Sequence, residues 1–149
     1  MQRFFIDSSA LLRRVLLEGD VAPVDELVVA GATTSTLAEV EVEVSIMRRR
    51  HAGEMNEAQA NGCLQSALEL FERLVRVDLT PAVRKEAVAV ARAHRVRSLD
   101  AIQLASAAVQ ARIERRHGHT VGFCTADRRQ AEAARSIFGE RRTILLDPL

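Results

Sequence analysis

Hydrophobic residues along the chain occur in two patterns, short continuous runs and longer stretches with helical spacing. The first run, Phe4-Phe5-Ile6, predicts a buried strand, because buried parallel strands read as continuous apolar segments. Further short strands are predicted near residues 32–35, 75–79, 120–124 and 143–146. Helical spacing predicts helices near residues 10–17, 24–30, 37–50, 55–74, 81–94, 98–116 and 128–138. Strands that alternate with helices predict one three-layer α/β/α domain over residues 1–149, with a mostly parallel sheet.

The stretch at residues 37–44 fits two structures. Its apolar residues and glutamates alternate with period two, which is typical of a half-buried strand. An apolar helical stripe is also present, and the arginines that follow suit the C-terminal end of a helix. This stripe consists of Leu37, Val40, Val44 and Met47. Because residues 32–35 already supply a strand, we expect a helix here as the next element of the α/β pattern.

Polar residues mark where several helices begin. Thr80-Pro81 predicts a helix start, with threonine as the cap and proline at the first helical position. We expect Ser98 to cap the next helix. One face of that helix is predicted to consist of Leu99, Ile102, Ser106, Val109 and Ile113. For the first helix we expect Ser8 or Ser9 as the cap, and the alternative is that Asp7 caps it, which would stabilise it by about 1 kcal/mol.

Composition favours an ordinary folded domain and leaves the choice of partner open. The chain has 149 residues, 48% of them hydrophobic, which is enough to bury a core and argues against disorder. The net charge of +1 neither requires nor excludes a nucleic-acid partner. Lys85 is the only lysine, so the basic side chains are almost all arginines, whose guanidinium groups suit phosphate. Most arginine clusters lie near predicted helix ends, and a solvated surface is the default interpretation for each.

Cysteine usage and hydropathy predict a cytoplasmic protein that is not embedded in a membrane. No apolar run approaches the roughly 20 residues needed to span a bilayer, and the chain enters its first strand without a basic and apolar leader. Cys63 and Cys124 lie far apart in the sequence and lack metal-ligand spacing. We therefore expect two reduced thiols.

Acidic residues lie where predicted strands end and helices begin. Asp7 and Asp127 each follow an apolar strand, a position that faces the ligand crevice of open α/β sheets. Asp100 lies in the first turn of an apolar helix, and one glutamate from residues 39–43 can face the same crevice. Converging carboxylates repel one another, and a hard divalent cation such as Mg²⁺ or Mn²⁺ resolves that repulsion. Such a site favours hydrolysis of phosphodiester bonds.

Four segments resemble, in order and at comparable spacing, the successive motifs of PIN-domain ribonucleases: 6–11, 35–41, 99–105 and 125–127. The likeness covers essentially the whole chain. Within the family, the chain more narrowly resembles the small toxins of bacterial and archaeal type II toxin–antitoxin pairs, the VapC group. It implies a PIN-like α/β/α fold and a Mg²⁺-dependent endoribonuclease that cleaves structured RNA. Homodimer formation and neutralisation by a small antitoxin protein are further implications of the resemblance.

The resemblance also implies which residues form the site. The acidic catalytic set would be Asp7, Glu41, Asp100 and Asp127, with the three aspartates as metal ligands. Ser9 and Thr125 would be supporting polar residues. Glu41 is preferred because its spacing from Ser35 best matches the toxin pattern, with Glu39 as the reserve and Glu43 as a solvated charge. Gln103 departs from the family, which often has histidine there, and this departure affects a secondary contact and not the metal site.

Other functional classes fit less well. A dehalogenase-type phosphatase needs a second aspartate where Ser9 stands, and a receiver domain needs a lysine after a late strand, whereas Lys85 lies in a predicted helix. His117 and His119 could form half of a metal site, but two histidines in a loop are more typical of a solvated turn. The main alternative is a catalytically silent PIN-like module that binds RNA or a protein. Retention of all the acids argues against that alternative.

Apolar surface predicts where partners bind. The helix at residues 55–74 and the segment at residues 24–29 carry more apolar residues than a small sheet needs to cover it. We expect these two segments to form a groove for part of an antitoxin and other helices to form a dimer face.

Overall fold

A parallel β-sheet with strand order β3-β2-β1-β4-β5 forms the centre of the molecule. The computed structural model describes residues 1–149, and all four strand pairings are parallel. The strands are β1 (Gln2–Ile6), β2 (Thr33–Ser35), β3 (Val75–Val77), β4 (Thr120–Thr125) and β5 (Thr143–Leu145). The longest pairing joins β1 to β4 along the whole of β1. The predicted α/β class with a parallel sheet is confirmed.

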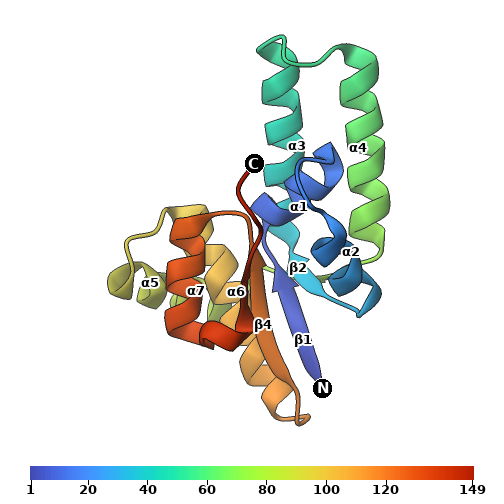
Figure 1. Ribbon diagram of the computed structural model, residues 1–149. Helices are drawn as coiled ribbons and strands as arrows, with labels where there is room; N and C mark the ends of the chain where they lie inside the picture. Colours follow the sequence, from blue (N-terminus) through green and yellow to red (C-terminus); the bar gives the residue numbers. More distant parts are fainter.

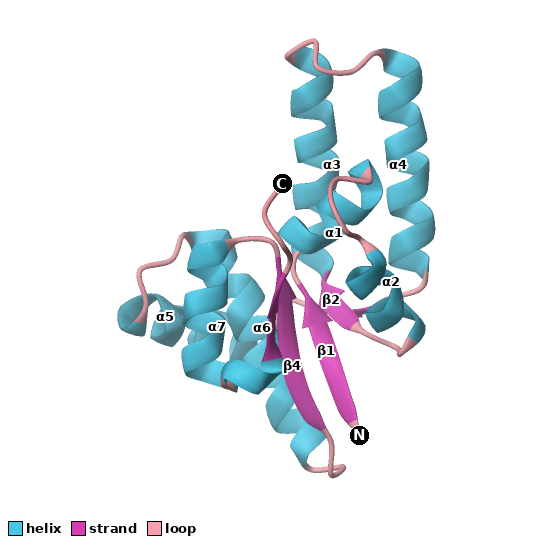
Figure 2. Ribbon diagram, in the orientation of Figure 1, coloured by secondary structure: helices cyan, strands magenta, loops and turns pink.

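Helices cover both faces of this sheet (Figures 1 and 2). They are α1 (Ser8–Leu16), α2 (Ala22–Val29), α3 (Thr36–His51), α4 (Glu57–Glu72), α5 (Pro81–Ala93), α6 (Ser98–Arg115) and α7 (Arg128–Phe138). Helices α1 to α4 share one apolar core with the sheet, and α5 to α7 share the other. Helices α3 and α4 form a hairpin that extends beyond the strands (Figure 1). None of the helices is long and apolar enough to cross a membrane.

Successive residues of β1 and β4 point to opposite cores, as the pleat of a strand requires. Phe5 and Phe123 pack with α5 to α7, whereas Ile6 and Cys124 pack with α1 to α4. The rings of Phe5 and Phe123 are stacked with centroids 5.6 Å apart, and Phe138 of α7 continues the stack at 5.7 Å. Because their side chains alternate between the two faces, the two central strands contribute to both cores. Burial of each large side chain there contributes roughly 1.5–3 kcal/mol to stability.

Gly122 in the middle of β4 lies where its neighbours leave no room for a side chain. A Cβ atom at this position would be 2.5 Å from the ring of Phe4 and 2.6 Å from the carbonyl oxygen of Arg142. The absence of a side chain therefore allows Phe4 and the segment that precedes β5 to pack directly against β4.

The stretch that fits both a strand and a helix is helical, as predicted. Ser35 caps α3, because its Oγ accepts a hydrogen bond from the backbone N–H of Ala38 at 3.1 Å. The predicted apolar stripe, however, is not the buried face, since Val40 is 57% exposed and Val44 is 49% exposed. The buried residues of α3 are Ala38, Val42 and Ile46. Valines occur on both sides of this helix, and the side with the small Ala38 is the one that packs against the sheet and α1.

The predicted cap of α6 is wrong, and for α1 the alternative cap, Asp7, is confirmed. Asp7, not Ser8 or Ser9, caps α1, since Asp7 is the last extended residue and its carboxylate accepts the N–H three residues further on. Helix α6 begins after Arg97, which makes no side-chain cap bond, and Ser98 is already the first helical residue. By contrast, the predicted start of α5 at Thr80-Pro81 is confirmed.

The buried face of α6 also differs from the predicted one. Leu99 is 46% exposed and Ile113 is 48% exposed, although both were expected on the packed face. The buried apolar residues of α6 are Ala101, Leu104, Ala105, Ala107 and Ala108. Alanines allow α6 to lie close to α5 and to the sheet, so the larger aliphatic residues at its two ends remain at the surface.

Candidate active site

The carboxyl ends of three neighbouring strands meet the starts of helices at one edge of the sheet. Asp7 follows β1, Ser35 ends β2 and Thr125 ends β4. A cavity of about 420 Å³ opens there. It is lined by Ser8, Ser9, Leu12, Glu41, Ser45, Arg97, Ser98, Leu99, Asp100 and Asp127. The fold thus brings three of the four predicted acids into one cavity from α3, from α6 and from the start of α7. We call it the acidic cavity.

Asp7, the fourth predicted acid, is buried beside the acidic cavity and is only 3% exposed. Its Oδ1 accepts hydrogen bonds from Ser9 Oγ at 2.7 Å and from the Ala10 N–H at 3.1 Å, and its Oδ2 accepts one from Thr125 Oγ1 at 2.5 Å. Burial raises the pKa of Asp7 from 3.8 to about 7, although the hydrogen bonds from Thr125, Ser9 and Ala10 oppose this rise. The carboxyl group therefore exchanges a proton near neutral pH.

Ser9 and Thr125, the predicted supporting residues, both contact the carboxylate of Asp7. Their hydroxyl oxygens are 3.1 Å apart. Ser9 Oγ accepts the N–H of Ala126 at 2.9 Å, and Thr125 Oγ1 accepts the N–H of Asp127 at 3.0 Å. These bonds join the start of α1 to the end of β4, so they hold the Asp7 carboxylate in one orientation.

Glu41 on α3 lines the acidic cavity and is held by two side chains. Ser8 Oγ donates to its Oε2 at 3.1 Å, and Gln103 Nε2 donates to its Oε1 at 2.6 Å. Gln103 is 1% exposed, and its Oε1 accepts from Ser35 Oγ at 3.0 Å. Burial raises the pKa of Glu41 and the charge of Asp100 adds to the rise, whereas the bonds from Gln103 and Ser8 lower it.

The two neighbouring glutamates of α3 point elsewhere. Glu39 forms an ion pair with Arg76 of β3. Glu43 is exposed and borders a different cavity on the outer side of α3. Among these three glutamates, only Glu41 lies in the acidic cavity.

Asp100 and Asp127 line the acidic cavity from the starts of α6 and α7. Asp127 caps α7, with its Oδ1 accepting the N–H groups of Arg129 at 2.8 Å and Gln130 at 3.1 Å. Burial raises the pKa of Asp100, the charge of Asp127 raises it further, and Arg97 lowers it. Arg97 is the single cationic residue in the lining, so the negative charges of the cavity are only partly compensated.

The donor set fits a hard divalent cation, although the side chains do not surround one directly. No group of three or more His, Cys, Asp or Glu side chains is arranged to hold a metal ion. Mg²⁺ in proteins is usually held by one or two carboxylates and keeps several waters, so a cavity lined by Glu41, Asp100 and Asp127 suits it. Burial is the main cause of the raised pKa values of Asp100 and Glu41, and neighbouring carboxylates add to the rise, so a bound cation would favour the ionised forms of both groups.

Several residues that contact the site were not identified from the sequence. Sequence patterns indicate only a helix cap for Ser8 and only a departure from a family pattern for Gln103. A buried polar residue within the alanine-rich middle of α6 was the signal that could have singled out Gln103. Arg97 and Ser45 gave no comparable signal, because surface arginines and serines are common.

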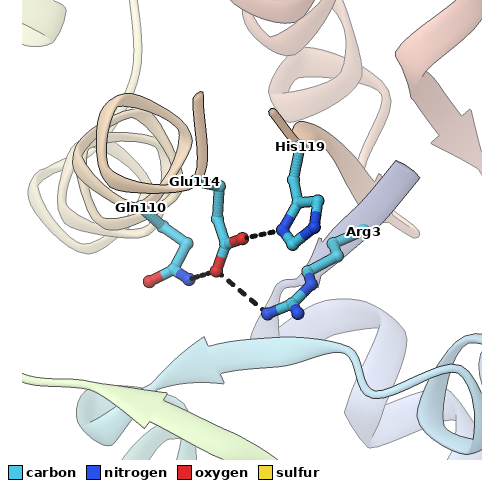
Figure 3. A network of polar contacts seen from close by, with 4 residues as sticks. All are labelled: Arg3, Gln110, Glu114 and His119. Carbon is cyan, nitrogen blue, oxygen red and sulfur yellow. Dashed lines mark hydrogen bonds and ion pairs between the residues drawn. The ribbon is translucent and has the colours of Figure 1, made fainter. Parts of the chain in front are cut away.

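The histidine pair that was considered as half of a metal site lies at the opposite end of the sheet. Figure 3 shows that His119 instead contacts Glu114, with 2.7 Å between its Nδ1 and Oε2. Arg3 Nη1 and Gln110 Nε2 donate to Oε1 of the same carboxylate at 3.0 Å and 2.9 Å. The bond from His119 lowers the pKa of Glu114, although its burial opposes this, and the network fixes α6 to the start of β1.

Comparisons with known proteins agree with this architecture. Residues 4–136 match the family model of the PIN domain, whereas no curated protein matches the sequence significantly. The crystal structure of PAE2754 from Pyrobaculum aerophilum is similar with a TM-score of 0.62 and 17% identity, over 89% of this chain and 79% of that chain. A toxin–antitoxin complex from Klebsiella pneumoniae gives a TM-score of 0.60 and 15% identity, over 97% and 98%. At these identities the solved structures show a shared fold. The family match extends over most of the sequence, and the chain therefore belongs to the PIN domain family.

Proposed function

We propose that this chain is a metal-dependent endoribonuclease that hydrolyses RNA phosphodiester bonds and acts as the toxin of a toxin–antitoxin pair. The observation that carries the proposal is the acidic cavity, in which Glu41, Asp100 and Asp127 come together beside the buried Asp7. Mg²⁺ is the proposed cofactor, and Mn²⁺ could take its place because it prefers the same oxygen ligands. A bound cation would stabilise charge on the phosphoryl oxygens and lower the pKa of the attacking water.

Each acidic residue has a distinct role in this proposal. Asp100, Asp127 and Asp7 would hold the cation, directly or through water, and Glu41 would orient the attacking water. Ser9 and Thr125 keep the Asp7 carboxylate in place through their hydrogen bonds. Because the pKa of Asp7 is about 7 without metal, binding of a cation should displace a proton there and depend on pH.

An antitoxin protein is the proposed partner that controls this activity. The similar fold of a toxin–antitoxin complex supports this assignment. Leu68 of α4 and Val29 of α2 are 55% and 75% exposed, and the antitoxin segment would cover them. A basic antitoxin side chain that enters the acidic cavity would compensate its charge in place of the metal, which would inhibit cleavage.

Cleavage by purified protein tests the nuclease proposal. We expect a labelled structured RNA to be cut with Mg²⁺ or Mn²⁺ and to stay intact with EDTA. Asp7→Asn should lower the rate at least about 100-fold, the usual size of effect when a proton-transfer or metal-holding group is lost. Glu43→Gln is the matched control, since it removes an exposed carboxylate from the outer side of α3. Equal cleavage by Asp7→Asn, or cleavage that resists EDTA, would contradict the proposal.

The alternative function is a catalytically silent PIN-like module that binds RNA or a protein. It predicts RNA binding, or capture of a partner, without any cleavage in either metal. Measuring binding and cleavage with the same preparation separates the two functions.

A further inference from the structure

A second cavity, of about 450 Å³, lies between α7 and the segment that connects α5 to α6. Its polar lining consists of His94, Arg95, Arg129, Glu132 and Ser136. Figure 1 shows α5, α6 and α7, the helices that flank this cavity, together on one side of the sheet. We call it the basic cavity.

The two arginines of the basic cavity have no acidic partner. Arg14, Arg49 and Arg76 each form an ion pair with a carboxylate, whereas neither Arg95 nor Arg129 does. Both side chains are exposed, and the only acid in the lining, which is Glu132, is also without an ion pair. Solvated arginines are common on protein surfaces, but here two unpaired guanidinium groups border the same concave site.

The basic cavity adjoins the acidic cavity on two sides. Arg95 lines the basic cavity and Arg97, two residues later, lines the acidic cavity. Two residues of extended chain span at most about 7 Å, so the backbones of these two arginines are close together. Val96 between them packs against the core of α5 to α7, which anchors the segment. On the other side, Asp127 in the acidic cavity accepts the N–H of Arg129 at 2.8 Å. The two cavities are therefore close together, linked by residues 95–97 and 127–129.

We propose that the basic cavity binds a backbone phosphate of the RNA strand, close to the phosphate that is cleaved in the acidic cavity. This inference rests on the proposed nuclease function. The guanidinium groups of Arg95 and Arg129 hold the phosphate oxygens, because their planar donors match phosphate geometry, and Ser136 supplies a hydroxyl. A phosphate contact positions the strand without reading its sequence. Arg97 lies along the path between the two sites.

The salt dependence of RNA binding tests this contact without any catalysis. The probe is a fluorescent single-stranded RNA of mixed sequence, and EDTA prevents cleavage. For single strands, the slope of log K against log salt changes by about 0.7 for each phosphate that is neutralised. Arg95→Gln combined with Arg129→Gln should flatten the slope by about 0.7, so the affinity difference from the parent shrinks about 2.6-fold between 50 and 200 mM salt.

The matched control removes the same charge at the far end of α6. Arg115 and Arg116 are exposed and form no ion pair, so Arg115→Gln with Arg116→Gln should keep the parent slope. Both double variants change only exposed side chains, and circular dichroism with thermal melting verifies that they fold. Equal slopes for the parent and the Arg95 and Arg129 variant would overturn the proposal. Equal flattening in both variants would do so as well, because it would indicate a general effect of net charge.

Replacement of single phosphates by neutral methylphosphonate linkages locates the contact. We expect one position close to the cleavage site where the neutral linkage weakens binding to the parent but not to the Arg95 and Arg129 variant. Absence of such a position would overturn the proposal, as would failure of the parent to bind RNA.

RNA cleavage that is unchanged in the variant would refute the phosphate site while the nuclease function stands. Conversely, the expected binding without cleavage in Mg²⁺ or Mn²⁺ would refute only the nuclease function.

Discussion

At the scale of single residues, Asp7 serves both as the N-cap of α1 and as the buried acid beside the cavity. The two roles use the same oxygen, since Oδ1 accepts the N–H of Ala10 that capping requires and also the hydroxyl of Ser9. Three hydrogen bonds lower the pKa of Asp7, but burial dominates and leaves it near neutrality. A capping aspartate at the end of a buried strand is therefore no evidence against a functional role.

The raised pKa of Asp7 predicts how stability depends on pH without metal. Because the folded-state pKa, about 7, lies above the unfolded value of 3.8, the stabilisation from proton uptake is complete below pH 3.8 and is lost as pH rises through 7. The total change is on the order of 4 kcal/mol, at 1.36 kcal/mol per pH unit. Asp7→Asn should therefore be more stable than the parent at pH 8 and similar to it at pH 4.

Urea unfolding in EDTA at several pH values measures this difference. Glu43→Gln serves as the control and should keep the parent profile, since it removes an exposed carboxyl group outside the cavity. The same pH dependence in Asp7→Asn and in the parent would show that Asp7 is ionised in the folded protein throughout this range.

Gln103 is predicted to be a positioning residue that acts through Glu41. Gln103→Met keeps a similar shape but removes the hydrogen bond that Glu41 Oε1 accepts and the acceptor of the Ser35 hydroxyl, which costs about 1–3 kcal/mol of stability. RNA cleavage should fall in this variant. In a Glu41→Gln background the same substitution should cause little further loss of cleavage, because the residue it orients is already changed.

Gln110→Met is the matched control for Gln103→Met, since it removes an amide from the same helix at the opposite end of the sheet. Equal loss of cleavage from the two substitutions, or fully additive losses with Glu41→Gln, would contradict the positioning role.

At the scale of elements, α3 shows why the alternating glutamates were ambiguous. Residues 37–44 alternate in type with period two, yet successive helical residues are about 100° apart, so the glutamates point in different directions. Glu39 turns to Arg76, Glu41 turns to the acidic cavity and Glu43 turns to solvent. Glutamine at these three positions should therefore have unequal effects.

Cleavage at limiting Mg²⁺ should fall most for Glu41→Gln, while Glu39→Gln and Glu43→Gln stay near the parent rate. Glu39→Gln should cost at most about 1 kcal/mol of stability, because its ion pair is partly exposed. Loss of activity in Glu39→Gln with activity kept in Glu41→Gln would reverse the assignment.

Two glycines of different elements predict stability changes of opposite sign. In Gly122→Ala the new methyl group would clash with the ring of Phe4 and with the backbone of the segment before β5, which should cost about 1–3 kcal/mol. Gly62 lies on the exposed face of α4, and a Cβ atom added there would have no neighbour within 4 Å outside the adjoining backbone of the helix. Gly62→Ala should therefore stabilise the helix by roughly 0.5–1 kcal/mol. Thermal melting of the two variants measures both changes, and the same sign for both would contradict this packing.

Much of the fold follows from local sequence, because β1 contains the apolar run Phe4-Phe5-Ile6 and Thr80-Pro81 is an unambiguous helix start. The buried faces of α3 and α6 did not follow, since both helices carry apolar residues on several sides and only tertiary packing selects one. In the site, strand-end acids were recognisable by position. The contacts of Ser8 and Gln103 were not, since they join residues 33 and 62 positions away from Glu41.

At the scale of the whole molecule, we expect two copies to associate through the outer side of α3. Val40 and Val44 are exposed there and border a cavity of about 600 Å³ together with Met47. Light scattering of the parent at tens of micromolar should give the mass of a dimer. Val44→Glu should shift it toward a monomer, because a charge would be buried in the interface.

Val88→Glu is the matched control for this surface, since Val88 is 52% exposed on α5, across the sheet from α3. It should leave the mass unchanged. A monomeric parent at these concentrations would rule out the homodimer.

The pairing of β1 with β4 has a consequence for synthesis of the protein. β1 begins at Gln2, whereas its central partner begins only at Thr120, so the middle of the sheet is completed by the last fifth of the chain. Asp127 and Thr125 belong to that same part. While it is still being translated, the polypeptide therefore lacks both a closed sheet and a complete set of acids. Under the nuclease function proposed above, the polypeptide would not cleave RNA, including the messenger that encodes it, before residues 120–127 have left the ribosome.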